Sequence, residues 1–238
     1  MNTLEGHGMS ISFRKRRVVN NVSVKVNSGE IIGLLGPNGA GKTTTFHMIL
    51  GIHNPDSGNI FLNGKDITKF PVYMRSRMGV GFLPQEPSIF KGLSVRDNIM
   101  AVMEYNNKSG DRDINTILKE MGLVELIDRK ASLLSGGERR RLEIARSLVL
   151  NPDFLLLDEP FAGIDPIQIK EIQELIVNFK AKGLGIIITD HNVREILKIT
   201  DRSYIINKGE LIFQGNSMEL ISDERVKEEY LGKEFRWN

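Results

Sequence analysis

One short stretch, Gly36-Pro37-Asn38-Gly39-Ala40-Gly41-Lys42-Thr43, matches the pattern G-x-x-x-x-G-K-[ST]. It directly follows the apolar run 31–35, which is typical of a strand covered on both faces, and it precedes a helical pattern over 42–50. Glycines at such positions let backbone N–H groups converge on phosphate oxygens at the positive end of the helix. Lys42 adds a cation for the β- and γ-phosphates, and the Thr43 hydroxyl is a suitable ligand for Mg²⁺. The stretch therefore predicts a site for a nucleoside triphosphate.

The motif itself does not distinguish ATP from GTP. Asn207-Lys208-Gly209-Glu210 partly resembles the N-K-x-D motif that reads guanine, but its acid is Glu rather than Asp. Asn, Lys and Gly are ordinary residues in a two-residue hairpin turn, and strand-like residues flank this segment on both sides. We interpret the segment as a turn.

The composition is typical of a soluble globular protein. The 238 residues are 40% hydrophobic and 26% charged, with no cysteine and a formal net charge of +2. This near-neutral charge argues against a nucleic-acid-binding protein, whose binding face is strongly basic. We find no secretory signal pattern, and every apolar run is too short for a membrane span of about 20 residues. We therefore expect a cytoplasmic protein that reaches a membrane only through partners and binds no nucleic acid.

Apolar runs and helical patterns alternate along the chain. The runs 154–157 and 186–188 have strand length, and apolar residues spaced i, i+3, i+4, i+7 between them indicate a helix. Asp165-Pro166 is a typical start for this helix, and Gly183 ends it. Strands separated by helices predict an α/β fold with a mainly parallel sheet. The other predicted elements are strands around 22–26, 59–62, 80–83, 204–206 and 211–213 and helices 94–105, 114–121, 139–150 and 192–199.

The middle of the chain, from about residue 87 to 131, is rich in helical patterns. Ser94 with Asp97 three residues later is a capping-box start for its first helix. The polar stretch 106–113 predicts a loop before the next helix. We expect this insert to form a helical subdomain rather than more sheet.

Two carboxylates, Asp158 and Glu159, follow the apolar strand 154–157. Open α/β sheets bind ligands at the carboxyl ends of their strands, which here places both acids beside the phosphate loop. Without that loop, a solvated strand end would be an equal alternative. Adjacent side chains point in opposite directions along a strand, so the two acids have different predicted roles. We predict that Asp158 holds Mg²⁺ through its water shell and that Glu159 activates the attacking water as a general base.

A second candidate anion site is the segment Leu134-Ser135-Gly136-Gly137-Glu138, which opens a helical pattern. A hydroxyl and closely approaching backbone amides at a helix start attract phosphate. The chain would then contain two phosphate sites and one acidic pair. A head-to-tail dimer explains this arrangement, because the second site of each copy would close on the nucleotide of the other.

These motifs, in this order, resemble those of the ATP-binding cassette (ABC) ATPases. The chain also contains the family's Gln85 after Phe82-Leu83-Pro84, its Asp165 loop, and His191 just after Ile188-Thr189-Asp190. The match covers essentially the whole chain, and Leu-Ser-Gly-Gly-Glu is its most specific single element.

The resemblance implies a P-loop NTPase fold with a mainly parallel core sheet, an N-terminal antiparallel β subdomain and a helical subdomain. Residues 1–238 would form a single ABC ATPase domain. Within it, 1–86 and 151–238 would make the core with the β subdomain, and 87–150 would make the helical subdomain that includes Leu-Ser-Gly-Gly-Glu.

The resemblance also implies roles for individual residues. Ser135 and Gly137 would contact the γ-phosphate held by the partner subunit. His191 would hydrogen-bond to the γ-phosphate of ATP. Gln85 would approach Mg²⁺ and the attacking water, and Asp165 would link the two sites across the dimer.

Phe13 aligns with the family's aromatic residue that stacks on adenine, where Tyr is more common, and a place in the core is its alternative. This implies ATP as the nucleotide. The nucleotide-binding candidates are Phe13, Gly36, Pro37, Asn38, Gly39, Ala40, Gly41, Lys42, Thr43, Thr44, Ser135, Gly136, Gly137 and Asp165. The catalytic candidates are Glu159, His191, Gln85 and Lys42, and the Mg²⁺ candidates are Thr43, Gln85 and Asp158.

Within the family, runs such as 33–46 and 189–195 resemble the lipopolysaccharide-export ATPases of Gram-negative bacteria. This implies a homodimer that binds two transmembrane permease subunits on the cytoplasmic face of the inner membrane and drives lipopolysaccharide extraction for export to the outer membrane. The alternatives are the ATPase of an amino-acid importer and a soluble ABC ATPase of DNA repair or translation. The residues expected to receive the permease are Phe90, Lys91 and Leu93.

The remaining polar candidates favour structural or surface positions. His7, His47 and His53 show no paired metal-ligand spacing. The basic run Arg14-Lys15-Arg16-Arg17 lies between two predicted strands and predicts a solvated turn, and Arg139-Arg140-Arg141 predicts the exposed face of a helix.

Overall fold

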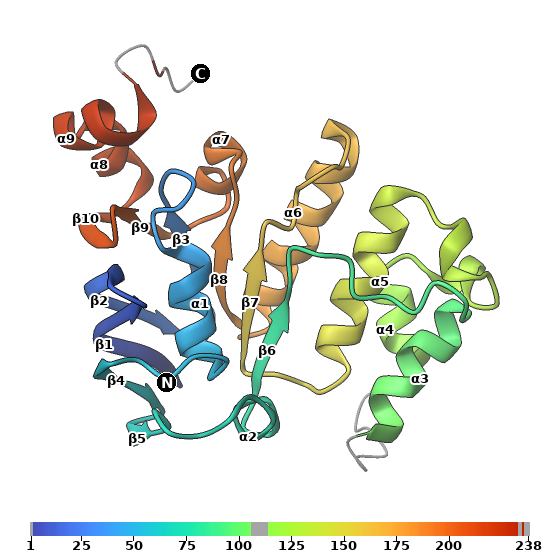
Figure 1. The fold of residues 1–238 in the computed structure, drawn as a ribbon. Coiled ribbons are helices and arrows are strands. Elements are labelled where there is room, and N and C mark those ends of the chain that lie inside the picture. Colours follow the sequence, from blue (N-terminus) through green and yellow to red (C-terminus); the bar gives the residue numbers. More distant parts are fainter. Residues whose placement is uncertain (1, 106–113, 233–234, 236–238) are drawn as a thin grey trace.

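The computed structural model describes residues 2–105, 114–232 and 235, so the polar loop predicted at 106–113 lies outside the described residues. A six-stranded sheet forms the centre, in the order β10-β9-β3-β8-β7-β6 (Figure 1). All neighbouring strands pair in parallel except β9 and β10, which form an antiparallel hairpin. The fold class predicted from the alternation of strands and helices is therefore confirmed. The strands are β3 (Ile31–Leu35), β6 (Val80–Leu83), β7 (Phe154–Asp158), β8 (Gly185–Thr189), β9 (Arg202–Asn207) and β10 (Glu210–Gly215).

Every residue of β3, β7 and β8 is buried, which explains why their sequences are continuous apolar runs rather than alternating ones. The register pairs Asp158 with Thr189 at the last position of β7 and β8. Because these strands run in the same direction, their carboxyl ends and the loop that follows β3 lie at one edge of the sheet.

A second, antiparallel sheet has the order β2-β1-β4-β5. Its strands are β1 (Thr3–Phe13), β2 (Arg16–Asn27), β4 (Ser57–Leu62) and β5 (Lys65–Asp66). Alternate residues Val22, Val24 and Val26 are buried, as the sequence predicts. The prediction of a turn over the whole basic run is wrong in its second half, because only Arg14 and Lys15 form the turn and β2 already begins at Arg16.

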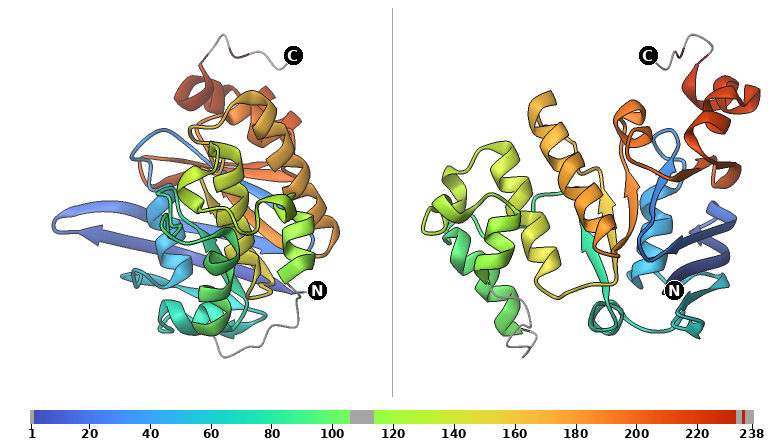
Figure 2. Two further views of the ribbon diagram at one scale, coloured as in Figure 1. Left: turned by 90° about the vertical axis from the view of Figure 1, so that its right-hand side faces the viewer. Right: turned by 180° about the vertical axis from the view of Figure 1, so that it is seen from behind.

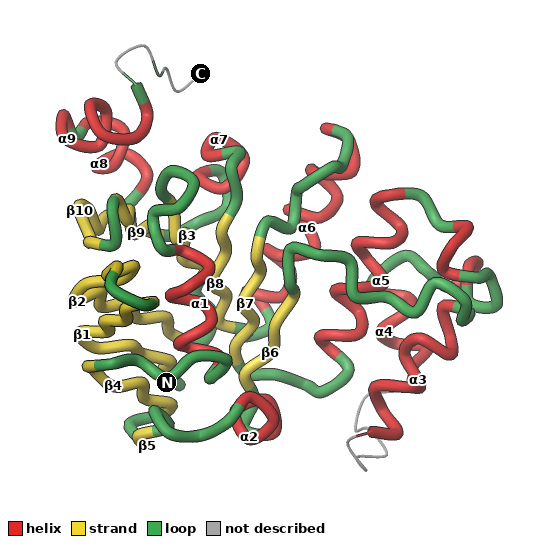
Figure 3. The backbone as a smooth tube through the Cα atoms, viewed as in Figure 1, coloured by secondary structure: helices red, strands yellow, loops and turns green. Residues whose placement is uncertain are grey.

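Helix α1 (Lys42–Leu50) packs between the two sheets, where its Phe46 and Met48 join buried residues of both. The opposite face of the central sheet is covered by α6 (Pro166–Ala181) and α7 (Val193–Leu197) (Figure 3). The sequence did not predict α2 (Val72–Arg77), a short helix before β6.

The predicted helical insert is present and lies beyond β6, away from α1 (Figure 2). Ser94 caps its first helix, since the Ser94 hydroxyl accepts from the Asp97 N–H at 3.0 Å. No helix in the described ranges is long and apolar enough to cross a membrane. The insert contains α3 (Val95–Tyr105) and α4 (Ile114–Glu120), with the 3₁₀ turn η1 (Val124–Leu126) and, at its end, the 3₁₀ turn η2 (Ala131–Leu133). Helix α5 (Gly136–Leu148) follows the insert and packs against α3 and α4.

The C-terminal part is helical and packs near β9 and β10 (Figure 1). It consists of α8 (Ser217–Ser222), α9 (Glu224–Val226) and the π-helical turn η3 (Lys227–Leu231).

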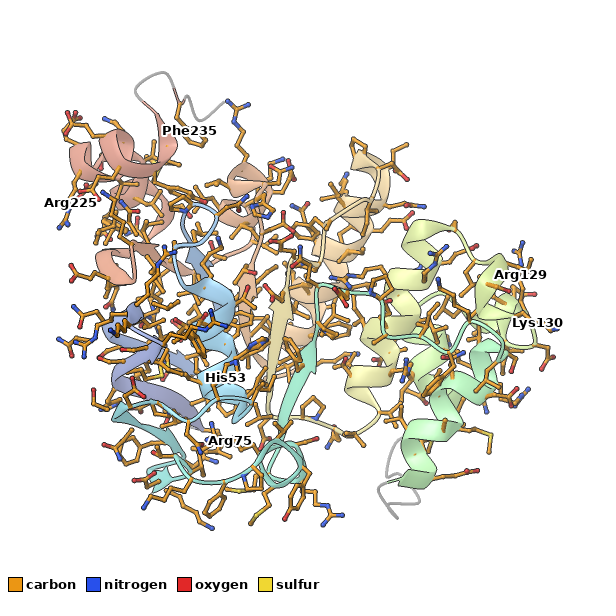
Figure 4. All side chains as sticks on the ribbon, viewed as in Figure 1. His53, Arg75, Arg129, Lys130, Arg225 and Phe235 are labelled. Carbon is orange, nitrogen blue, oxygen red and sulfur yellow. The ribbon has the colours of Figure 1, made fainter. Side chains whose placement is uncertain are left out.

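Arg75 of α2 is the largest fully buried side chain, only 1% exposed, and it lies beneath the C-terminal end of α1 (Figure 4). Its guanidinium donates to the carbonyls of Met48 at 2.7 Å and Ile49 at 2.6 Å, and also to those of Phe70 and Thr68. Burial lowers the pKa of Arg75 to about 10. The side chain thus supplies hydrogen-bond donors to two carbonyls at the end of α1, where few intrahelical amides remain to bind them.

Candidate functional site

The phosphate loop joins β3 to α1, as its sequence context predicts. Lys42 is buried, and its ammonium donates to the carbonyls of Gly36 at 2.8 Å and Pro37 at 3.1 Å. Burial lowers the pKa of Lys42, while the charges of Glu159 and Asp158 act in the opposite direction. The lysine therefore sits inside the loop, with two acids near enough to influence its charge.

Gly36 of this loop is required by a close backbone approach. A Cβ on Gly36 would lie 2.0 Å from the Ile206 carbonyl, and Gly36 has φ +148°. Gly41 is the N-cap of α1 and gives no side-chain cap, so the first amides of the helix remain available to an anion.

A hollow of about 670 Å³ opens beside the loop. Its lining residues are Arg16, Arg17, Val18, Pro37, Asn38, Gly39, Ala40, Asn207 and Lys208. Asn207 and Lys208 belong to the β9–β10 hairpin, where Lys208 has φ +47°, so the segment resembling a guanine-reading motif is a turn, as interpreted from the sequence.

Asp158 and Glu159 lie at the end of β7 and have different surroundings. Asp158 is buried, and its Oδ1 accepts from the Thr189 hydroxyl at 2.6 Å. Glu159 has φ +49°, an uncommon conformation for a residue with a side chain. Its backbone N–H donates to the Thr189 carbonyl at 2.9 Å, which helps to hold this conformation. The register of β7 and β8 thus fixes both acids through one neighbouring residue.

The structure brings Gln85, Glu159 and His191 together from three separate loops. The Glu159 carboxylate accepts from Gln85 Nε2 at 2.8 Å, and its other oxygen lies 2.5 Å from His191 Nε2. Glu159 is only 8% exposed, whereas the side chain of His191 is half exposed. The carboxylate is therefore oriented by two polar side chains at the same sheet edge as the phosphate loop.

Arg140 of α5 holds the backbone beneath these acids. The prediction that Arg139-Arg140-Arg141 forms an exposed face is wrong for Arg140, which is 7% exposed. Its guanidinium donates to the carbonyls of Glu159 at 2.8 Å and Pro160 at 3.1 Å and pairs with Glu143 at 2.8 Å. A fixed fork of five donors suits this task, and the helical spacing of the sequence gave no sign of it.

Ser135 caps α5, which begins at Gly136, three residues earlier than predicted. The Ser135 hydroxyl accepts from the Glu138 N–H at 3.2 Å, and the Ser135 N–H donates to the Glu138 carboxylate at 2.7 Å. This backbone hydrogen bond is the main reason that the pKa of Glu138 is lowered. Ser135 and Gly136 are exposed, whereas Gly137 is buried against Gln168, whose side chain would lie 2.6 Å from an added Cβ.

Within one chain the segment that begins with Ser135 and the phosphate loop do not meet. Helices α1 and α5 lie on opposite sides of β7 and β6 in Figures 1 and 2. Gly136 instead lines a separate hollow of about 130 Å³ with Gln85 and Arg140.

Asp165 is the N-cap of α6, and its carboxylate accepts from the amides of Ile167 and Gln168 at 3.0 Å each. Phe13, the last residue of β1, is 41% exposed, which excludes the alternative of a place in the core. Its ring contacts the ring of His53, with 5.2 Å between centroids.

Sequence reasoning missed Tyr230, which reaches the phosphate loop from the C-terminal turn η3. Burial raises the pKa of Tyr230 to about 12, and the Gly36 backbone interacts with its hydroxyl. No motif marks this residue, because the contact depends on how the C-terminal helices return to the central sheet.

Phe90, Lys91 and Leu93 are all exposed, in the segment that follows Gln85. The Phe90 ring lies 4.7 Å from the guanidinium carbon of Arg146. Arg146 also lines a neighbouring hollow of about 230 Å³ between α2, β6, α3 and α5. This surface therefore combines apolar side chains with cations.

Comparison with known proteins agrees with this geometry. The family model described as ABC transporter matches residues 19–162. The lipopolysaccharide export system ATP-binding protein LptB of Escherichia coli is 50% identical over 99% of this chain and its own full length. An uncharacterized ABC transporter ATP-binding protein of Rhizobium meliloti is 52% identical over 98% of this chain and 87% of that protein. The ADP conformation of MJ1267, an ATP-binding cassette of an ABC transporter, superposes with a TM-score of 0.88 and 30% identity over 98% of this chain and all of that one. The chain therefore belongs to the family of ABC transporter ATP-binding proteins.

Proposed function

We propose that this chain is the ATP-hydrolysing subunit of a transporter that extracts lipopolysaccharide from the inner membrane for export. The observation that carries the proposal is the full-length similarity to LptB, whose name assigns it to lipopolysaccharide export.

In this proposal Glu159 is the general base that takes a proton from the attacking water. Glu159 directly follows the buried strand β7, and Gln85 and His191 lie within hydrogen-bonding distance of its two carboxylate oxygens. Both neighbours would be free to turn toward water and γ-phosphate when ATP binds. Lys42 would transfer its hydrogen bonds from the loop carbonyls to phosphate oxygens.

Mg²⁺ would be held jointly by the chain and the nucleotide. The described residues include no group of three or more His, Asp or Glu side chains able to hold a metal alone. The oxygen donors of Thr43, Asp158 and Gln85 suit Mg²⁺, which keeps several waters and binds through few protein ligands. The bound ion would neutralise charge on the β- and γ-phosphates.

The phosphate loop would bind the triphosphate through residues 36–44, and the Phe13 ring would stack on the adenine. Ser135, Gly136 and Gly137 would complete the site of the partner subunit in a head-to-tail homodimer, with Asp165 near the junction. The separation of α1 and α5 within one chain supports this arrangement, because a single chain cannot close its own site.

Two transmembrane permease subunits would dock where Phe90, Lys91 and Leu93 are exposed, on the cytoplasmic face of the inner membrane. Leu93→Asp should therefore prevent co-purification of the permeases in detergent. The matched control is Val177→Asp, which changes a similarly exposed apolar residue on α6. Assembly that survives Leu93→Asp would contradict this docking site.

The function is tested by reconstituting the chain with its co-purified membrane partners in vesicles that contain lipopolysaccharide. We expect ATP-dependent release of lipopolysaccharide, which the Glu159→Gln variant abolishes. ATP-dependent uptake of amino acids by the same complex, without lipopolysaccharide release, would instead identify an importer. Retention of the purified chain on nucleic acid in a salt-dependent manner would favour a soluble ABC ATPase.

A further inference from the structure

Three rings form a chain of edge contacts beside α1, which we call the ring cluster: Phe13, His53 and His47. The Phe13 and His53 centroids are 5.2 Å apart with 70° between ring planes. The His53 and His47 centroids are 5.4 Å apart with an angle of 62°. Both geometries are the edge-to-face arrangement that aromatic rings prefer. His53 lies at the C-terminal end of α1 in Figure 4.

The backbone holds His53 between the two elements that carry its neighbours. The His53 N–H donates to the His47 carbonyl at 3.2 Å, which ties the loop to α1. Farther along the loop, the Asp56 N–H donates to the Ser10 carbonyl and the Asp56 carboxylate accepts from the Ser12 N–H, each at 2.8 Å. The loop therefore links the end of α1 to the end of β1, next to Phe13.

His47 is the member of the ring cluster that belongs to α1. Burial lowers its pKa, and the nearby His53 lowers it further, while Asp158 acts in the opposite direction. A neutral imidazole can pack edge-to-face with another ring without charge repulsion.

Phe13 itself is 41% exposed, so without a neighbour its ring would sample several rotamers. A ring that stacks on a base binds more tightly when it is already oriented, because less side-chain entropy is lost on binding. We propose that His53 is a positioning residue, which orients the Phe13 ring for the base of bound ATP. This inference rests on the proposed base-stacking role of Phe13.

The test measures kcat and KM for ATP on the full-length protein, with His53→Ala and His53→Phe. One lost aromatic contact corresponds to a rise in KM of about two- to twelvefold. We expect this rise in His53→Ala with kcat unchanged, because the phosphate chemistry occurs at the other end of the nucleotide. His53→Phe keeps a ring at this position and should restore KM.

His7→Ala is the matched control. His7 makes the same kind of edge contact with Phe61, at 5.2 Å and 60°, on the same antiparallel sheet but away from Phe13. It should leave KM unchanged. An equal rise in His7→Ala would show that the effect of His53→Ala is a general loss of packing in this sheet, and would overturn the proposal.

Phe13→Ala separates this inference from the function on which it rests. If Phe13→Ala raises KM but His53→Ala does not, Phe13 stacks on the base and the positioning role of His53 is wrong. If Phe13→Ala leaves KM unchanged, the stacking role itself fails and the inference fails with it. If both raise KM and the double variant is no worse than Phe13→Ala alone, His53 acts through Phe13 as proposed.

Discussion

The surroundings of Glu159 at the end of β7 and of Ser135 at the start of α5 differ in how many side chains of the same chain already contact them. At the end of β7, Glu159 is buried and already contacts Gln85 and His191 of its own chain. At the start of α5, Ser135 is exposed, and its hydroxyl is engaged only with the cap of its own helix. The Glu159 carboxylate is thus oriented within one chain, whereas the segment at Ser135 faces outward. Under the proposed function, the general base would be in place before the dimer closes, and hydrolysis would depend on what approaches Ser135.

The largest expected effect is the loss of ATP hydrolysis when the carboxylate of Glu159 is removed. Glu159→Gln keeps the shape of the side chain and removes the base, so we expect kcat for ATP hydrolysis to fall about 10²–10⁴-fold. Binding of ATP should persist, as measured by equilibrium binding of a fluorescent analogue. Glu86→Gln, at an exposed site one residue after Gln85, is the control. Turnover close to that of the unmodified protein would remove Glu159 from this role.

Lys42→Ala should weaken the binding of ATP and leave the general base, Glu159, in place. The loss of a charge-assisted hydrogen bond of about 1.5–3 kcal/mol corresponds to roughly a ten- to hundredfold weaker affinity for ATP, measured by calorimetry. Lys208→Ala is the control, because it removes a cation of the hairpin turn that lines the hollow beside the phosphate loop. An equal loss in both variants would mean that general positive charge, rather than the position of Lys42, attracts the nucleotide.

Ser135→Asp and Ser135→Asn probe the outward-facing site. Both residues are good helix caps, so the stability of α5 should change little. Asp places a negative charge against the partner's phosphate, so we expect it to reduce ATPase activity more than Asn does. Mixing Ser135→Asp with Lys42→Ala should then restore part of the activity, because mixed dimers keep one intact site. Absence of any recovery would contradict a shared site.

The smallest expected effect is on the free energy of unfolding, and it depends on pH through the Glu138 carboxylate at the start of α5. The folded pKa of Glu138 lies below its ordinary value of 4.5, so its stabilising effect is present above that pH and is lost as pH falls through the lower folded value. Glu138→Gln should cost about 0.5 kcal/mol at pH 7. The difference in the midpoint of thermal unfolding between variant and wild type should shrink as the pH falls below 4.5. Glu174→Gln, exposed in the middle of α6, should show no such convergence.

Much of the central fold could be predicted from the sequence because its signals are local. The buried runs of β3, β7 and β8 are continuous and apolar, and Asp165-Pro166 marks the start of α6 in both sequence and structure. The start of α5 was predicted three residues too late, but the sequence does mark it, because Ser135 and Glu138 have the spacing of a capping box. By contrast, α2 begins after Pro71 with no side-chain cap and has no clear apolar period.

Part of the site could also be predicted. The strand end beside the phosphate loop indicates Glu159, and the family resemblance implies catalytic roles for Gln85 and His191. The structure places the Gln85 and His191 side chains against the Glu159 carboxylate. Arg140 could not be foreseen, because its acceptors are backbone carbonyls near residue 160 that carry no sequence signature. Tyr230 likewise depends on tertiary packing of the C-terminal turn against Gly36.

The buried guanidinium of Arg75 should slow the opening of the C-terminal end of α1. The last turn of a helix ordinarily frays first, and its amides exchange hydrogen with solvent quickly. Here fraying would strip a buried cation of the carbonyls of Met48 and Ile49, and an unpaired buried charge is costly. The amides at this end of α1 should therefore exchange slowly, and the helix that begins at Lys42 should open from its phosphate end rather than from its tail.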